Sequence, residues 1–219
     1  VWLSTQANGS SALLGGKANG LLQLIKLGLP VPPGFVLTTS FFASSNTQQL
    51  IKQKSSLIQA AYEHLGKLLS IKHPAVAIRS SALAEDAAHH SFAGAFHTSL
   101  WVRGLAHLAD KIGQCNNRLF SARANGYRAE MPMTALETAV PQMAIILQAM
   151  IPAQAAGVMM TLNPSNGDRS KIVIESTWGL GQLLVEGTIN PDRFLVDKIT
   201  GEIIEQTIAY KTNKLEAAG

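Results

Sequence analysis

The residues best suited to chemistry follow an apolar run in the first half of the chain. Residues 76–78 are apolar and precede Arg79, two serines and a loop of small residues that reaches Gly94. Arginine offers a planar fork that matches phosphate oxygens bidentately, and glycine lets backbone approach a ligand closely. The pattern predicts half of a nucleoside triphosphate site, with Arg79 at a strand end; a surface salt bridge is the alternative for this arginine.

A second cation follows a glycine pair near the N-terminus. Lys17 comes directly after this pair, at the predicted start of a helix, where phosphate groups are favoured. The stretch is not a Walker A loop, because Ser11 and Ala18 stand where that loop needs glycine and Ser or Thr. A flexible loop with a solvated lysine is the alternative interpretation.

Four further residues are candidates, each with a structural alternative. Gly94 and Thr98 lie four residues apart at the entry of a predicted strand, where Gly94 suits a tight turn or close approach to a phosphate and Thr98 is an ordinary strand residue. Gln148 interrupts an apolar run and must find hydrogen-bond partners, either in neighbouring backbone or at a junction of two lobes beside an adenine. Glu175 ends an apolar strand, where a carboxylate binds a ribose hydroxyl or a metal, or caps a helix.

The composition excludes several classes of protein. The chain has 219 residues, of which 47% are hydrophobic and 15% charged, and its net charge of +4 is scattered rather than gathered in a nucleic-acid footprint. The single cysteine, Cys115, indicates a reducing compartment, and no signal peptide or long apolar span is visible. We therefore expect a cytoplasmic protein that binds neither nucleic acid nor membrane. The six histidines are interpreted as structural or solvated, and no metal ligand is predicted.

Hydrophobic periodicity divides the chain into a helical part and a strand-rich part. We expect helices after the glycine pair up to residue 28, over 46–69 and over 103–126. Strands are expected at 34–38, 75–79, 95–102, 143–151, 155–162, 171–177, 193–198 and 202–210. The runs 143–151 and 155–162 are predicted to form a hairpin of buried strands. The pattern predicts an α+β fold with two lobes, residues 1–147 and 148–219.

In order along the chain, five stretches resemble the N-terminal nucleotide-binding domain of the phosphoenolpyruvate synthase and pyruvate phosphate dikinase family. They are Gly-Gly-Lys at 15–17 with Gly-Leu-Pro-Val-Pro-Pro-Gly-Phe at 28–35, Ile-Arg-Ser-Ser-Ala at 78–82, Ser-Phe-Ala-Gly at 91–94, Gln-Ala-Met at 148–150 with Ala-Gly-Val-Met at 156–159, and Trp-Gly-Leu-Gly at 178–181 with Pro-Asp-Arg at 191–193. The segment 202–211 looks more like the rifampicin phosphotransferase branch.

The resemblance implies an ATP-grasp fold, in which two lobes surround a nucleotide cleft. By position it implies that Lys17 and Arg79 contact the phosphates, with a catalytic role for Arg79. It also implies that Gly94 and Thr98 form the phosphate-side loop. Gln148 would lie beside the adenine and Glu175 near the nucleotide.

The resemblance also implies a reaction and its partners. The family transfers a phosphoryl group from ATP, with Mg²⁺, to a histidine on a separate swivelling domain that then serves pyruvate or another acceptor. The family's metal-binding acidic strand and a Gln-Ser-Arg-Pro-like strand do not occur in this sequence. We therefore expect an incomplete second lobe, metal ligands outside this chain, and no turnover by this chain alone. A rifampicin phosphotransferase, a phenylphosphate synthase-like enzyme and a degenerate binding module are the alternatives.

Overall fold

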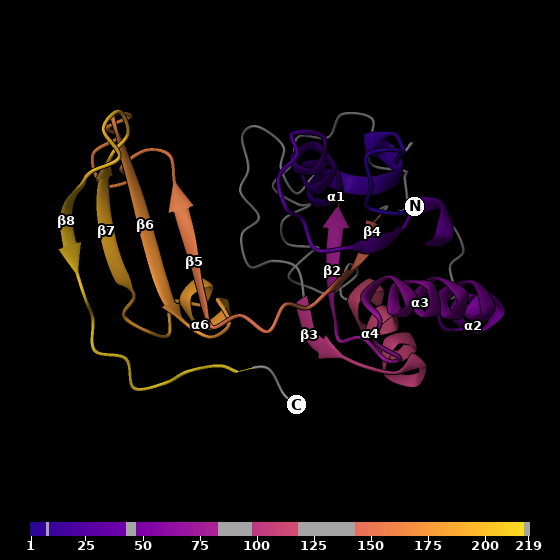
Figure 1. The fold of residues 1–219 in the computed structure, drawn as a ribbon. Helices are drawn as coiled ribbons and strands as arrows, with labels where there is room; N and C mark the ends of the chain where they lie inside the picture. Colours follow the sequence, from indigo (N-terminus) through magenta and orange to yellow (C-terminus); the bar gives the residue numbers. More distant parts are fainter. Residues whose placement is uncertain (8, 43–46, 83–97, 118–142, 217–219) are drawn as a thin grey trace, which may run out of the picture. The chain divides into compact units, whose positions relative to one another are not determined.

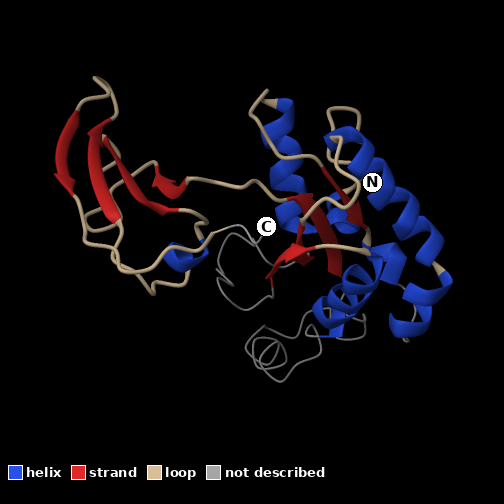
Figure 2. Cartoon of the chain, turned by 60° about the horizontal axis from the view of Figure 1, so that its bottom comes forward, coloured by secondary structure: helices blue, strands red, loops and turns tan. Residues whose placement is uncertain are grey.

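The computed structural model describes residues 1–7, 9–42, 47–82, 98–117 and 143–216. The chain divides into two compact units, Val1–Met150 and Ile151–Gly219. Each unit contains one four-stranded antiparallel sheet, and most of the described helices belong to the first unit (Figure 2). The α+β class predicted from the sequence is confirmed.

The sheet of the first unit has the strand order β1-β4-β2-β3. Figure 1 labels three of these strands, β4, β2 and β3. Its strands are β1 Gly34–Leu37, β2 Val76–Ala82, β3 Thr98–Val102 and β4 Met143–Ala149. Every neighbouring pair is antiparallel. The central strand β4 is buried along its whole length, which explains its continuous apolar sequence: a strand covered on both faces does not alternate between apolar and polar residues.

Helices cover both faces of this sheet. They are α1 Ser11–Lys26, the 3₁₀ helix η1 Thr39–Phe42, α2 Thr47–Gln53, α3 Ser55–Leu69 and α4 Leu105–Asn117. Because side chains alternate along a strand, Ile145 and Leu147 of β4 join the core under α3 and α4. Ala144 and Ile146 face the other way and join a smaller core under α1. The sheet thus has an α1 face and an opposite, helix-sealed face.

The second unit is a meander in which each strand pairs with the next. Its elements are β5 Ala155–Met160, β6 Lys171–Trp178, the short helix α6 Gln182–Val185, β7 Asp192–Asp197 and β8 Ile203–Thr207. The predicted final hairpin around residues 200 and 201 is present as β7 and β8. The buried apolar side chains described in this unit are few: Val173, Leu180 and Leu184.

The predicted hairpin of residues 143–162 is wrong. Strand β4 pairs with β1 and β2 in the first unit, whereas β5 pairs with β6 in the second. Residues 152–154 belong to the connection between the units rather than to a tight turn, and β5 is largely exposed instead of buried. Two apolar runs separated by a short polar stretch look like a hairpin in sequence, but only the pairing partners distinguish a hairpin from a crossing between units.

The predicted helices differ from the observed ones in two places. The helix expected over 46–69 is two helices, since α2 ends at Gln53 and α3 begins at Ser55. The helix expected over 103–126 is described as α4 up to Asn117, and its remaining residues lie outside the described part of the chain. No helix within the described ranges has the length and apolar character needed to cross a bilayer.

Helix α1 is broken at the glycine pair rather than preceded by it, which corrects the predicted loop. Gly15 has φ 74° and ψ 172°, outside the helical region, although helix continues on both sides. An ideal Cβ at Gly15 would lie 2.1 Å from the carbonyl oxygen of Ser81. Only glycine fits this position, because the backbone is left-handed in φ and β2 lies directly against it.

We predict that Gly15→Ala lowers the free energy of unfolding by about 2 kcal/mol or more, since it adds both backbone strain and overlap with β2. Urea unfolding of the purified chain measures this change. Gly20→Ala is the matched control: it lies in the same helix with no atom within 4 Å of the new Cβ, and should stabilise by about 0.5–1 kcal/mol. Equal effects at the two positions would contradict the role given to Gly15.

Candidate functional site

The glycine pair and the Arg-Ser-Ser stretch meet at one buried hydroxyl. Ser81 Oγ donates to the carbonyl oxygen of Leu14 at 2.8 Å and accepts from the N–H of Ala18 at 3.1 Å. These two backbone groups would bond each other in a regular helix, so the serine is inserted into the helical ladder at the break. The second half of α1 therefore begins against β2.

This inserted bond places Lys17 near the strand that carries Arg79. Lys17 directly precedes Ala18 and stands with Gly16 at the start of the second helical segment, the end of a helix that favours anions. Ser81, on β2, lies two residues beyond Arg79. Lys17 and Arg79, which are far apart in sequence, thus lie on two elements, α1 and β2, that are hydrogen-bonded to each other through Ser81 at one joint.

Arg79 lies inside β2 rather than at its end, because the strand continues to Ala82. Every residue of β2 is buried except Arg79, which is partly exposed. Its cross-strand partners are Ile146 on β4 and Thr98 on β3. Directly opposed residues in an antiparallel pair project from the same face, and Ile146 packs under α1. Arg79 and Thr98 therefore belong to the α1 face.

Gln148 lies on the same face at the end of β4, in the first unit. It is two residues from Ile146, and its cross-strand partners are Ala77 and Gly34. The side chain is 6% exposed, and its Nε2 donates to the carbonyl oxygen of Pro32 at 3.1 Å. The bond to neighbouring backbone, one of the two interpretations drawn from the sequence, is present, and it fixes the orientation of the amide.

The structure thus brings together four of the six predicted residues: Lys17, Arg79, Thr98 and Gln148 share the α1 face or the joint beside it. Gly94 lies outside the described residues. Glu175 belongs to the second unit, where it lies in the middle of β6 rather than at its end and opposes Arg193 of β7. The strand expected over 171–177 is present as β6, and the polar residues that follow Glu175 still pair in the sheet, so Glu175 lies inside the strand instead of at its end.

The second unit has its own organising contact, which the sequence analysis missed. The ammonium group of Lys211 forms an ion pair with Asp192 Oδ1, although the lysine side chain is only 1% exposed. The N–H of Ala209 donates to the same oxygen at 3.0 Å, and the lysine ammonium lies 5.5 Å from the centre of the Trp178 ring. Nothing in the spacing of Asp192 and Lys211 marks the pair, because they lie on different segments.

The segment that follows Lys211 is bound to the Trp-Gly-Leu-Gly stretch. The N–H of Leu180 donates to the carbonyl oxygen of Leu215 at 2.8 Å. Gly179 has φ 72°, and an ideal Cβ there would lie 2.2 Å from that same oxygen. The glycine is needed because the returning backbone passes so close. The 178–181 and 191–193 stretches are therefore joined through the C-terminal segment.

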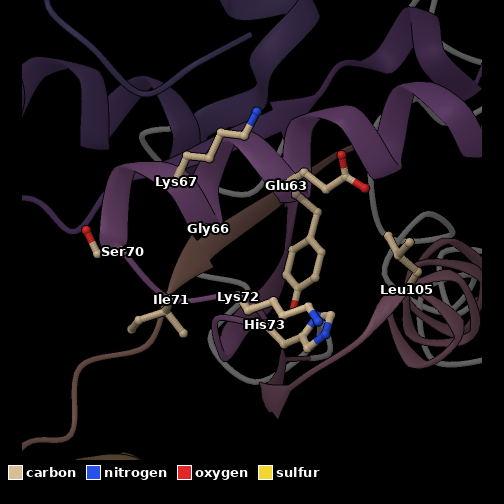
Figure 3. Close-up of a pocket in the computed structure, with 9 residues that line it drawn as sticks. Glu63, Gly66, Lys67, Ser70, Ile71, Lys72, His73 and Leu105 are labelled. Atoms are coloured by element: carbon tan, nitrogen blue, oxygen red, sulfur yellow. The ribbon is translucent and has the colours of Figure 1, made fainter.

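A cavity of about 450 Å³ lies elsewhere in the first unit, on the face opposite α1 (Figure 3). Figure 3 shows Glu63, Gly66 and Lys67 on α3 above it and Ile71, Lys72 and His73 on the segment below. None of the predicted site residues lines it. No cluster of three or more His, Cys, Asp or Glu side chains suited to a metal occurs within the described ranges.

The first unit is an α+β domain, and comparison with known proteins identifies the family. Residues 46–218 match the family model of the pyruvate phosphate dikinase AMP/ATP-binding domain. The chain belongs to this family. It is thus an ATP-binding domain of the ATP-grasp type, and the resemblance drawn from the five sequence stretches is confirmed.

Relatives extend the match to the N-terminal residues. The chain is 36% identical to a phosphoenolpyruvate synthase of Aeropyrum pernix over 98% of its length, which covers 30% of that protein. It is 38% identical to the prodigiosin synthesizing transferase PigC of Serratia marcescens over 90% of its length, covering 24% of PigC. An uncharacterized phosphotransferase, YvkC of Bacillus subtilis, is 31% identical over 99%, covering 27%. The chain spans about a third or less of these relatives.

We predict that acidification destabilises the second unit through Asp192. The bond from Lys211 holds the pKa of Asp192 below its ordinary value of 3.8, so the stabilisation is complete above about pH 4 and is lost as the pH falls through the lowered pKa. Asp197 responds in the same sense, because Lys171 and the N–H groups of Ile199 and Thr200 lower its pKa. Asp192→Asn should lower stability at pH 7 by about 1–3 kcal/mol and flatten the acid dependence.

Hydrogen exchange of the amides of β6 and β7, measured from pH 7 downward and corrected for intrinsic rates, follows this change within the second unit. Asp110→Asn is the control, because the Asp110 side chain is 60% exposed and lies 4.0 Å from Lys111 in the first unit. Identical pH profiles for the wild type and Asp192→Asn would show that the Lys211 contact does not stabilise this unit.

Proposed function

We propose that the first unit binds ATP on the α1 face of its sheet, with the triphosphate at the joint between α1 and β2. The observation that carries this proposal is the insertion of Ser81 Oγ into the broken turn of α1. It ties Lys17 to the strand of Arg79, so that an ammonium and a guanidinium serve one anionic ligand. The family membership supports ATP as that ligand.

In this proposal the two cations have different tasks. The guanidinium of Arg79 holds two phosphate oxygens at once, because its donors are planar and fixed relative to each other. Lys17 supplies a compact charge at a helix start. Phosphoryl transfer needs positioned groups and neutralised charge more than a protein nucleophile, and Arg79 acts as the catalytic residue in this sense.

The other predicted residues complete the proposed site. Thr98 stands beside Arg79 in the sheet and, with Gly94, forms the phosphate side. Gln148, whose amide is held by Pro32, lies beside the adenine. Glu175 is assigned a contact to the nucleotide by family resemblance alone.

For the longer protein we propose phosphoenolpyruvate synthase-like chemistry: a phosphoryl group of ATP passes to a histidine on a separate domain and from there to pyruvate or another acceptor. The phosphoenolpyruvate synthases among the relatives support this choice. The two compact units, Val1–Met150 and Ile151–Gly219, form the first and second lobes, so the boundary lies three residues beyond the one expected from the sequence. Mg²⁺ accompanies ATP with ligands that we do not assign to this chain, and the buried thiol of Cys115 suits the cytoplasm.

We predict that Arg79→Ala and Lys17→Ala each weaken ATP binding by about 10- to 100-fold, since each removes charge-assisted hydrogen bonds of about 1.5–3 kcal/mol. Isothermal titration calorimetry of the chain with ATP measures this loss. The controls remove the same charges elsewhere: Arg169→Ala in an exposed turn, and Lys26→Ala at the exposed end of α1. If all four variants bind ATP as the wild type does, the proposed phosphate site is wrong.

A further inference from the structure

The edge strand of the first unit contains a residue in an unusual conformation. Trp101, near the end of β3, has φ 56°, in the left-handed region that large side chains avoid. Such backbone strain is retained where the surrounding structure imposes it, and it gathers at ligand sites. Trp101 also belongs to neither of the two hydrophobic clusters described in this unit, so core packing does not account for it.

Trp101 lies in a β-bulge of strand β3, where β3 pairs with β2. Val76 opposes Val102 and Ile78 opposes Ser99, which leaves Leu100 and Trp101 together opposite Ala77. On its other side Ala77 pairs with Gln148. Trp101 therefore lies in the same cross-strand row as Gln148, with one strand between them.

This row runs beside the row of the proposed phosphate contacts. Arg79 pairs with Thr98 and lies two residues along β2 from Ala77, a separation of about 7 Å. A nucleotide that lies along the sheet with its phosphates at Arg79 extends its base toward the row of Gln148 and Trp101. The row of Arg79 and Thr98 thus suits the phosphates of ATP, and the row of Gln148 and Trp101 suits its base.

The indole of Trp101 has an unused hydrogen-bond donor. Its Nε1 is buried, yet it has no acceptor among the described residues. The guanidinium of Arg103 lies 5.9 Å from the ring centre and holds a positive charge over the indole. Buried donors without partners are uncommon in folded proteins, and one that lies beside a ligand site is explained when the ligand supplies the acceptor.

We propose that Trp101 is a base-contact residue: its indole packs against the base of the nucleotide bound on the α1 face, and Nε1 donates to a ring nitrogen of that base. The proposal rests on the proposed function, since it needs a nucleotide on this face. It adds a specificity-determining residue at the end of the site away from the phosphates.

Calorimetric titration with two probes, ATP and inorganic tripolyphosphate, tests the proposal. Trp101→Asn removes the indole while keeping a residue that tolerates the left-handed conformation, so the chain should unfold at an equal or higher temperature. It should bind ATP about tenfold more weakly than the wild type and tripolyphosphate equally well. Trp101→Phe keeps a ring without the donor and should bind ATP with intermediate affinity.

Two controls calibrate these titrations. Arg79→Ala should weaken the binding of both probes, because it acts on phosphates. Tyr210→Asn removes an aromatic ring that is 88% exposed in the second unit and should change neither affinity.

The outcomes separate this inference from the proposed function. If the wild type binds ATP and Trp101→Asn binds it equally well, the base contact is wrong while the phosphate site stands. If Trp101→Asn loses affinity for ATP and tripolyphosphate alike, Trp101 acts through the phosphate site or the fold and the base contact is again wrong. If the wild type binds neither probe, the proposed function and the inference fall together.

Discussion

One hydroxyl group replaces a backbone hydrogen bond at the break in α1 and joins this helix to β2. Ser81 Oγ occupies the gap between Leu14 and Ala18 and bonds both. Without it a buried donor and a buried acceptor would lack partners, each at a cost of about 1–3 kcal/mol. The same bond fixes the turn that carries Lys17 to the strand that carries Arg79. The same two hydrogen bonds therefore stabilise the break in α1 and set the position of the Lys17 backbone relative to β2.

The two faces of the first sheet differ in what covers them. Helices α2, α3 and α4 seal one face with a large apolar core, whereas the core under α1 is smaller. Arg79, Thr98 and Gln148 all project from the less covered face, because strand alternation sends every second residue there. The division between a structural face and a polar face follows from the pairing register of β2 and β4.

The second unit combines a small apolar core with one buried ion pair. Its described buried apolar residues are few, and the pair of Asp192 and Lys211 joins the start of β7 to the segment after β8. A lysine with a 1% exposed side chain is stable only with a counter-charge beside it. The ring of Trp178 and the close passage of backbone at Gly179 complete this joint.

The sequence by itself determined the fold class, most strands and the family. Apolar runs locate β1, β2 and β4 because these strands are buried, and they also locate β6 to β8, although β8 is exposed along its length. Five ordered motifs specify the family. It failed where the outcome depends on a partner far along the chain. The sequence put β4 and β5 in one hairpin, since periodicity records burial and not which strand lies alongside.

Only the tertiary structure decided how the motifs become a site. The break at Gly15, the insertion of Ser81 and the bulge at Trp101 all arise from segments that meet after folding, and no local spacing records them. The residue types thus determine the proposed chemistry, in which a guanidinium and an ammonium bind one anion. The strand register and the buried hydroxyl of Ser81 determine where these side chains lie, because distances and directions between side chains are set only when the strands pair.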